Sequence, residues 1–363
     1  MKIAVIGTRG IPNIQGGIET HCEELYPRLI NLGCEVILFR RSCYVTQSNK
    51  IQSYKGIELK DIFTIKQKNL ETLLHTFLSI FYAKKAKVDI LHIHAIGPSI
   101  MTPLARLLGL KVVVTHHGQD YNRQKWGVMA KTVLKAGEYL STKYANELIV
   151  ISNEINSIIK NIYKRFNSNL IYNGVNIPTK SNKTNYINSL GLETKKYIFT
   201  LGRFVEEKGF EGLIRAFSKL NNSEYKLVIA GDADIPSKYS KYLKQLAKDK
   251  NIVLTGFVKG EKLNELFTHA QLFVLPSFHE GLPISLLEAM SYNVDILVSD
   301  IPPNLEIKLP ENCYFICGDW NNLTFKLNEK LSKKEIPSYD LSLYDWNNIA
   351  LQTLDVYTKL IIH

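Results

Sequence analysis

The chain has 363 residues, 45% of them hydrophobic, and a net charge of +11 at pH 7. This length and composition suit one or two globular domains with a sizeable core, and they exclude a disordered or low-complexity chain. Residues 1–178 carry 23 Lys+Arg and 12 Asp+Glu, whereas the rest of the chain is balanced. The first half therefore either faces an anionic partner or has a basic surface that only aids solubility; without a recognised motif, nucleic acid is not expected.

The apolar stretches are too short for a signal peptide or a membrane span. IAVIG (3–7) runs straight into a glycine-rich segment, and LLHTFLSIFYA (73–83) is interrupted by polar residues. The five cysteines contain no C-x-x-C pair, so we expect neither disulfides nor a cysteine metal site, and a reducing cytoplasm fits best.

Residues 1–178 alternate short apolar segments with amphipathic ones. The apolar segments, each typical of a buried strand, are KIAVIG (2–7), CEVILFR (34–40), VDILHIH (88–94), KVVVTHH (111–117) and NELIVIS (146–152). Helical spacing lies between them, as at 19–33 and 69–86. Strands that are apolar on both faces are typical of a parallel sheet covered by helices, so this half is predicted to be a doubly wound α/β domain.

The pattern restarts after a polar segment, residues 179–191, that is typical of a linker. Strands are expected at 197–203, 225–231, 251–257, 272–276 and 295–300, and helices at 209–220, 237–250, 259–270 and 283–291. The predicted fold class is therefore α/β, with two Rossmann-like domains, 1–178 and 179–343, facing across a cleft. A last helix at about 344–363 is expected to pack back on the first domain through apolar residues such as Trp346 and Tyr357.

The segment GTRGIPNIQGGIE (7–19) joins the first predicted strand to the first helix. It lacks the G-x-G-x-x-G spacing of a dinucleotide loop and instead delivers Gly16 and Gly17 to a helix start. A helix N-terminus attracts anions and glycine lets them approach the backbone, so an anion site is one interpretation. A long loop that only needs glycine for its turns is the other. Glu19 is expected to cap the helix.

Charged residues follow several predicted strands, where open parallel sheets bind ligands. Arg203 and Lys208 precede a helix, an arrangement suited to a diphosphate held without a metal. Glu280 and Glu288 flank Pro283, which suits a first helical turn, and their carboxylates can accept hydrogen bonds from sugar hydroxyls. Solvated surface charges are the alternative for both pairs.

Several motifs occur together in one order. They are the glycine segment, THHGQD (115–120), NGV (173–175), GRFVEEKG (202–209), LTGFV (254–258), EGLPISLLE (280–288) and a closing DW…Y helix. This set resembles the retaining GT-B glycosyltransferases of family 4, which carry the E-x7-E element, over essentially the whole chain. The opening and HHGQDYNRQKW (116–126) are similar to the subgroup of bacterial polysaccharide rhamnosyltransferases.

The resemblance implies a role for each matching residue. Gly16, Gly17, Arg203 and Lys208 would hold the donor diphosphate, and Glu288 would accept from the ribose hydroxyls. Glu280 and the backbone of Gly281, Leu282, Pro283 and Ile284 would bind the transferred sugar, with Phe257 and Val258 near the base. His117 would lie next to that sugar, with a structural histidine beside His116 as the alternative. Asp120 is an acid or acceptor-binding candidate.

The implied reaction moves a hexose, with rhamnose from dTDP-rhamnose favoured, from a nucleotide sugar to a glycan or lipid-linked glycan in cell-surface polysaccharide biosynthesis. No carboxylate is placed as a covalent nucleophile, so retention by front-face attack is favoured, with the leaving diphosphate taking the acceptor's proton. No cofactor or metal is expected. Asp232-Ala233-Asp234 has the D-x-D form of a metal site, but it follows a strand of the second domain, where this family has no metal.

The charge asymmetry suits an acceptor carried on a lipid diphosphate. Basic residues near apolar helical stretches predict peripheral contact with an anionic membrane, at the cytoplasmic face of the plasma membrane. These residues are Lys84, Lys85, Lys87, Lys125, Lys131, Lys135 and Lys143.

Three alternatives remain open from the sequence. A dinucleotide oxidoreductase requires an acid after the second strand, which instead ends FRRS (39–42). A catalytically inactive sugar-nucleotide-binding protein would keep the same binding residues. A GT-B sugar-nucleotide epimerase would bind a donor and need no acceptor.

Overall fold

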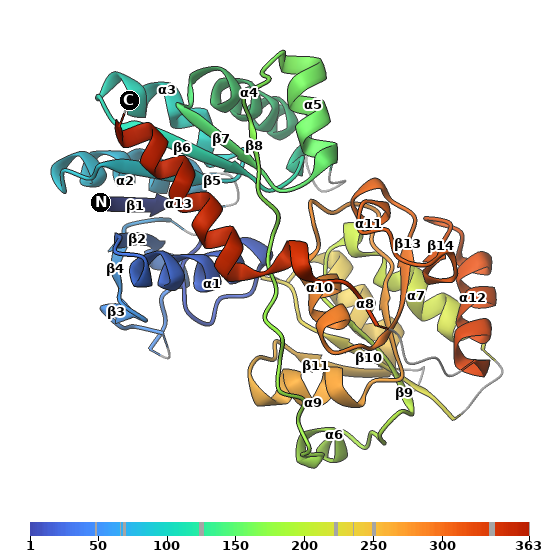
Figure 1. Ribbon diagram of the computed structural model, residues 1–363. Coiled ribbons are helices and arrows are strands. Elements are labelled where there is room, and N and C mark those ends of the chain that lie inside the picture. Colours follow the sequence, from blue (N-terminus) through green and yellow to red (C-terminus); the bar gives the residue numbers. More distant parts are fainter. Residues whose placement is uncertain are drawn as a thin grey trace. The chain divides into compact units, whose positions relative to one another are not determined.

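The computed structural model describes residues 1–47, 49–65, 67, 70–122, 127–220, 224–234, 236–248, 252–333 and 338–362. Residues 123–126 of HHGQDYNRQKW, including Lys125, lie outside the described residues. The chain divides into two compact units (Figure 1): unit 1 is Met1–Gly174 with Tyr344–His363, and unit 2 is Val175–Leu343. The boundary between the units thus follows Gly174, whereas the sequence analysis places it after Pro178.

Unit 1 is built on a sheet in the order β3-β4-β2-β1-β5-β6-β7-β8, parallel throughout except for the β3–β4 pair. Its strands are β1 (Lys2–Ile6), β2 (Glu35–Arg41), β3 (Ser53–Tyr54), β4 (Ile57–Ile62), β5 (Ile90–His94), β6 (Lys111–His116), β7 (Glu147–Val150) and β8 (Asn169–Leu170). The five strands expected from the sequence are present. The β3–β4 hairpin was not expected, because its short alternating segment buries one face only.

Helices cover the sheet of unit 1. They are α1 (Gly17–Asn31), α2 (Leu70–Lys85), α3 (Thr102–Leu107), α4 (Val128–Tyr144), α5 (Asn153–Tyr163) and α13 (Trp346–Ile362), with 3₁₀ turns η1 (Ser42–Tyr44), η2 (Pro98–Met101) and η3 (Asp120–Asn122). Although α13 is the last element of the chain, Trp346, Ile349 and Tyr357 share one buried cluster with Leu25 and Leu29 of α1. A side chain at Gly174 would overlap the Trp346 ring, so glycine is needed there.

Unit 2 has a parallel sheet in the order β11-β10-β9-β12-β13-β14. Its strands are β9 (Tyr197–Leu201), β10 (Lys226–Ala230), β11 (Ile252–Gly256), β12 (Leu272–Leu275), β13 (Asp295–Ser299) and β14 (Tyr314–Phe315). Its helices are α6 (Asn185–Ser189), α7 (Phe210–Phe217), α8 (Lys238–Lys248), α9 (Glu261–His269), α10 (Ile284–Ser291), α11 (Pro302–Leu305) and α12 (Trp320–Ser332), with 3₁₀ turns η4 (Glu206–Lys208), η5 (Glu311–Cys313) and η6 (Ser342–Tyr344).

The polar segment 179–191, expected to be a linker, belongs to the structure of unit 2. It contains α6, and its backbone binds α9: the Ser181 N–H donates to Asn264 Oδ1 at 2.9 Å, and the Tyr186 N–H donates to Glu265 Oε2 at 2.7 Å. The linker prediction was therefore wrong, because polar side chains of another helix hold the backbone of this segment.

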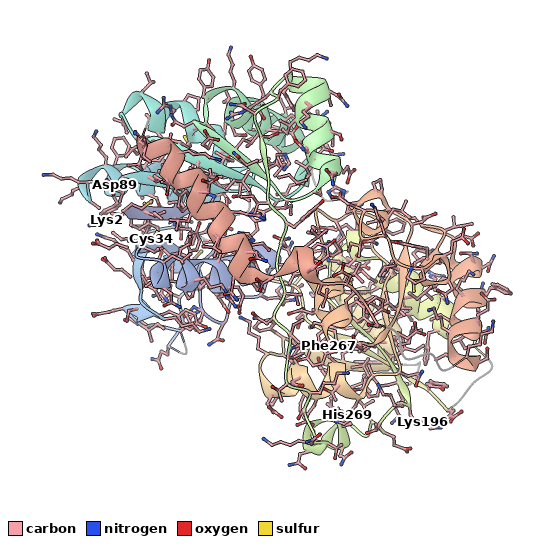
Figure 2. The ribbon with its side chains drawn as sticks, in the orientation of Figure 1. Lys2, Cys34, Asp89, Lys196, Phe267 and His269 are labelled. Atoms are coloured by element: carbon pink, nitrogen blue, oxygen red, sulfur yellow. The ribbon has the colours of Figure 1, made fainter. Side chains whose placement is uncertain are left out.

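The amino ends of the strands carry structural contacts. In unit 1 the Lys2 N–H donates to Asp89 Oδ2 at 2.7 Å; Figure 2 labels Lys2, which begins β1, and Asp89, which precedes β5. The described residues include no helix with the length and apolar character that a bilayer span requires.

Candidate functional site

In unit 2 the strand order reverses between β9 and β12, and the charged residues of interest follow these two strands. From β9 the chain moves outward through β10 and β11, whereas β12 lies on the other side of β9. Such a switch point leaves a crevice at the carboxyl ends of the strands, which is where open α/β sheets bind ligands. Arg203 and Lys208 follow β9, and Glu280 follows β12, so the fold brings these residues to one place.

The loops after β9 and β12 are joined by backbone contacts. The Phe278 N–H donates to the Glu207 carbonyl at 2.9 Å. Next to it, Gly209 has φ +66°, and a Cβ there would lie 2.0 Å from the carbonyl oxygen of Pro276. Glycine is therefore needed at this position for two reasons, its backbone conformation and its close approach to the neighbouring loop. This contact holds Lys208 beside the loop that carries Glu280.

Lys208 and Glu280 form an ion pair, with Nζ 2.6 Å from Oε1 and both side chains mostly buried. Burial raises the pKa of the Glu280 carboxyl, but the charge of Lys208 and the hydrogen bond it donates outweigh that effect and hold the pKa below its ordinary value. The Glu280 carboxylate is therefore charged at neutral pH. The pair presents an ammonium and a carboxylate to the crevice, groups that suit a phosphate and a sugar hydroxyl respectively.

Arg203 is held by an acidic residue of the segment Asp232–Asp234. Its Nη1 lies 3.2 Å from Asp234 Oδ2, and Lys244 Nζ lies 2.7 Å from Asp232 Oδ2. The two carboxylates of the apparent D-x-D motif thus each face a cation in this structure.

The remaining predicted residues of unit 2 follow β11 and β12 in the sequence. Pro283 precedes α10, so Glu280 stands before this helix and Glu288 lies within it, where it is partly exposed. Gly281 is partly buried, and Leu282, Pro283 and Ile284 are buried. Phe257 and Val258 follow β11, and the Phe257 ring is exposed.

In unit 1 the switch point lies between β1 and β5, and the glycine segment 7–16 follows β1 there. A Cβ at Gly7 would meet the His94 backbone, and a Cβ at Gly16 would lie 1.9 Å from Glu19 Oε2, whereas a Cβ at Gly17 would have no atom within 4 Å. The surface at Gly17, the first residue of α1, is therefore open. An anion can approach the free N–H groups of this helix start.

Glu19 does not cap α1, contrary to the expectation. Its buried carboxylate accepts from the Thr8 hydroxyl at 3.1 Å and from the Arg9 N–H at 3.0 Å, so it holds the glycine segment instead. The Gly16 N-cap position has no side-chain hydrogen bond. The physical reason is that the segment folds back over the first turn of α1 and supplies donors that are nearer than the helix end.

His117 follows β6 and does not stand alone. Its Nε2 lies 2.8 Å from Nδ1 of His94, the last residue of β5, and its ring packs edge-on against His21 of α1 with centroids 5.0 Å apart. Burial, followed by repulsion from neighbouring imidazoles, holds the pKa of His117 well below its ordinary value, so the ring is neutral at pH 7.

The neighbouring His116 has a structural role. Its Nε2 is 2.7 Å from Oε1 of the buried Glu138, which also accepts from the hydroxyls of Tyr121 at 2.9 Å and Tyr163 at 2.5 Å. These bonds hold the segment after β6 on both sides of His117. Asp120 begins η3 within this segment and is partly exposed.

The sequence analysis did not predict that other histidines lie next to His117. His92 and His94 were read only as part of a strand, and His21 only as part of a helix. The signal present in the sequence was the pair H-x-H at the end of a predicted strand, because residues two apart on a strand point to the same face.

Both halves of the chain match known families. Residues 15–178 match "Glycosyltransferase Family 4", and residues 182–338 match "Glycosyl transferases group 1". The chain is 27% identical to the uncharacterized glycosyltransferase MJ1607 of Methanocaldococcus jannaschii over 98% of each chain. It is 30% identical to the UDP-Gal:alpha-D-GlcNAc-diphosphoundecaprenol alpha-1,3-galactosyltransferase of Escherichia coli, over 68% of this chain and 64% of that one.

Among solved structures, sucrose-phosphate synthase (tll1590) from Thermosynechococcus elongatus superposes with a TM-score of 0.82 at 21% identity, over 99% of each chain. An identity this low supports the fold alone. The two family matches and the two Rossmann-like units together identify the chain as a glycosyltransferase family 4-like protein of the GT-B fold.

Proposed function

We propose that this protein is a retaining hexosyltransferase that uses a nucleoside-diphosphate sugar. The observation that carries the proposal is the placement of Arg203, Lys208 and Glu280 at the switch point of unit 2, joined by the Lys208–Glu280 pair. Two cations suit a diphosphate, and a carboxylate beside them suits the hydroxyls of the sugar attached to it. The family matches support transfer chemistry over nucleotide binding alone.

In unit 2, Arg203 and Lys208 bind the donor diphosphate and stabilise the negative charge that grows on it as the sugar leaves. Arg203 exchanges Asp234 for phosphate oxygens, which it can contact with two N–H groups at once. Glu280 and the backbone of residues 281–284 bind the sugar, Glu288 accepts from the ribose hydroxyls, and Phe257 with Val258 lies against the base.

In unit 1, Gly16 and Gly17 allow the diphosphate to approach the start of α1. Gly17 has open space around its Cα, so an anion meets no side chain there. His117 contacts the transferred sugar as a neutral hydrogen-bonding group, and Asp120 contacts the acceptor. No metal takes part in binding the diphosphate.

The chemical step replaces one bond at the anomeric carbon with another on the same face. The bond from this carbon to the diphosphate oxygen breaks, the acceptor oxygen attacks from the face that the diphosphate leaves, and the acceptor's proton passes to a diphosphate oxygen. The residues of unit 2 favour this step electrostatically and need not form a covalent bond to the sugar.

For the donor we favour dTDP-rhamnose, because of the opening motif, and a UDP-hexose is the competing candidate. The Escherichia coli relative carries UDP-Gal and a diphosphoundecaprenol acceptor in its name, which supports a lipid-diphosphate-linked glycan as acceptor. Pockets that choose among hexoses can differ by a single hydroxyl contact, so the donor must be found by assay.

A surface of unit 1 supports peripheral contact with an anionic membrane. On α2, Phe77, Phe81 and Tyr82 are exposed beside Lys84 and Lys85. On α4, Val128, Met129 and Tyr139 are exposed beside Lys135 and Lys143. Mixed apolar and basic faces bind anionic interfaces at the cytoplasmic leaflet. Sedimentation with vesicles of phosphatidylglycerol should be lost in high salt; a protein that stays in the supernatant at low salt contradicts this part.

The first experiment is a thermal-shift panel with dTDP, UDP, GDP and NAD. A ligand at a hundred times its dissociation constant stabilises the folded state by about 2.7 kcal/mol. One nucleoside diphosphate should shift the melting temperature, and Lys208→Met and Gly17→Ala should reduce that shift, whereas the exposed Lys244→Met should not. A shift with NAD alone would overturn the proposal.

Transfer is then tested with the matching nucleotide sugar and a lipid-diphosphate-linked acceptor. The anomeric configuration of the product, read by NMR, should equal that of the donor. Nucleotide binding without turnover on any acceptor would favour the inactive binding protein, and a changed sugar without an acceptor would favour the epimerase.

A further inference from the structure

Unit 1 contains a cluster of three imidazoles from three separate elements. His21 lies on α1, His94 ends β5, and His117 follows β6. One ring nitrogen of each lies within 4.8 Å of one ring nitrogen of the other two. His21 and His94 are buried and His117 is partly exposed, so the cluster has one side open to solvent.

One ring nitrogen of His21 forms a hydrogen bond, and the other forms none among the described residues. Its Nδ1 lies 3.0 Å from the amide oxygen of Asn173, which can only accept, so Nδ1 carries the proton. Nε2 is then an unprotonated lone pair. Among the described residues no group bonds to this Nε2, although it is buried. A buried polar atom without a partner is costly and requires an explanation.

The ring nitrogen of His94 that does not face His117 is held by one hydroxyl group. Its Nε2 lies 2.5 Å from the Tyr26 hydroxyl, which also lies 2.9 Å from His92 Nδ1. With a proton on Nε2, His94 donates to Tyr26 and keeps a lone pair on Nδ1, toward His117. Metal-binding histidines are typically oriented in this way, by a donor bond from the ring nitrogen that does not bind the metal.

We propose that His21 Nε2, His94 Nδ1 and His117 Nε2 bind one divalent transition-metal ion of the Zn²⁺ type. Three imidazoles select Zn²⁺, Co²⁺, Ni²⁺ or Cu²⁺ over the oxygen-preferring Mg²⁺ and Ca²⁺. Three protein ligands leave a fourth, open coordination position. The site departs from the expectation that this chain holds no metal, and all three of its ligands belong to unit 1.

Metal binding requires the three nitrogens, which now lie within 4.8 Å of one another, to move to tetrahedral spacing. Zinc–imidazole bonds of about 2.0–2.1 Å in a tetrahedron place the nitrogens about 3.3 Å apart. His94 Nδ1 and His117 Nε2, now 2.8 Å apart, must separate slightly, and the proton between them moves to Nδ1 of His117. Burial lowers the pKa of His21 to about 4 and holds those of His94 and His117 well below the ordinary value. The three imidazoles are therefore already neutral at pH 7, and none has to lose its extra proton before it binds a metal ion.

One consequence rests on the proposed function. If His117 contacts the transferred sugar, a metal ion on its Nε2 fixes the ring and places its proton on Nδ1, and Zn²⁺ should inhibit transfer. Metal binding itself does not depend on this role. A failure of the transferase proposal would leave the binding result untouched, and the two are therefore distinguishable.

The test measures metal binding by the intact, untagged protein. After treatment with a chelator, the protein is titrated with Zn²⁺ by calorimetry and with Co²⁺ by visible absorption, whose d–d bands report imidazole coordination. We expect one equivalent to bind, with Zn²⁺ displacing Co²⁺. Wild-type protein that takes up no stoichiometric metal, or shows no d–d bands, overturns the proposal without any variant.

Matched variants locate the site. His21→Asn should abolish the d–d bands, and Asn173→Ala, which removes only the partner of His21, should weaken binding by about 10–100-fold. His269 is the control histidine, because Figure 2 shows it on α9 of unit 2, where its Nε2 is bonded to the Lys183 carbonyl. Binding that survives His21→Asn, or that is lost in His269→Asn, refutes this location; circular dichroism checks that each variant is folded.

Discussion

The ion pair between Lys208 and Glu280 allows the donor-site electrostatics to be tested through stability alone. Lys208→Met removes the cation and leaves a carboxylate in surroundings that exclude most water. Breaking a buried pair in this way costs about 3–5 kcal/mol. The side chains retain 17% and 11% exposure, so we expect the lower end, about 3 kcal/mol at pH 7. Glu280→Gln added to Lys208→Met should restore part of this loss, because no charge is then buried.

The pH dependence gives the sign of the effect. In the wild type the pKa of Glu280 is lowered in the folded state, so the pair contributes stability above the ordinary carboxyl pKa that is lost as pH falls. In Lys208→Met both effects of Lys208 are gone, and burial, the largest effect and one that raises the pKa of Glu280, is opposed only by the smaller effects of Ser277 and His279. The folded variant then takes up a proton more readily than the unfolded chain. Its stability deficit relative to the wild type should therefore shrink as pH falls from 7 toward 5.

Urea denaturation at pH 7 and pH 5, followed by tryptophan fluorescence, measures both effects. Lys244→Met is the matched control, because the Lys244–Asp232 pair is exposed at 46% and 40% and should contribute no more than about 1 kcal/mol. A Lys208→Met deficit that equals the control, or that is the same at both pH values, would refute the reasoning.

Three further predictions concern buried groups and a glycine. Burial first, and the charge of Arg41 second, lower the pKa of His75 to about 3, so the folded state loses stability as pH falls below 6.5. His75→Leu should remove about 2 kcal/mol of the stability loss between pH 7 and pH 5. An unchanged dependence of the unfolding free energy on pH, measured by urea titration, would count against this prediction. Lys330 and Asp295 form an ion pair whose side chains are only 5% and 2% exposed, and Lys330→Met removes its cation. The free energy of unfolding should fall by about 3–5 kcal/mol in denaturation experiments, and a fall under 1 kcal/mol is inconsistent with this prediction. Gly209→Ala should cost about 2 kcal/mol or more and weaken nucleoside-diphosphate binding in thermal-shift assays, because its Cβ would meet the neighbouring loop; a wild-type melting temperature contradicts this.

The order of strands and helices could be read from the sequence because the signal is local. The expected strands appear as β1, β2, β5, β6 and β7 in unit 1 and as β9 to β13 in unit 2. Continuous apolar runs such as KLVIA (226–230) are buried on both faces, which only a covered parallel sheet allows. Segments without such runs were misjudged: the β3–β4 hairpin was missed, and α6 was taken for linker.

The donor-site residues were also predictable, because their type and position at strand ends are visible in the chain. Their pairing was not. Nothing in the sequence states that Lys208 lies 2.6 Å from Glu280, since that distance depends on β9 and β12 being neighbours.

The sequence by itself determined the alternation of strands and helices and which charged residues end the strands, because apolar periodicity and residue chemistry act over a few positions. Only the tertiary structure decided the strand order, the turning of Glu19 onto Thr8 and Arg9, and the meeting of His21, His94 and His117. These three histidines are more than twenty residues apart in the sequence. Their proximity follows from burying both faces of one sheet, a requirement that the whole chain satisfies together.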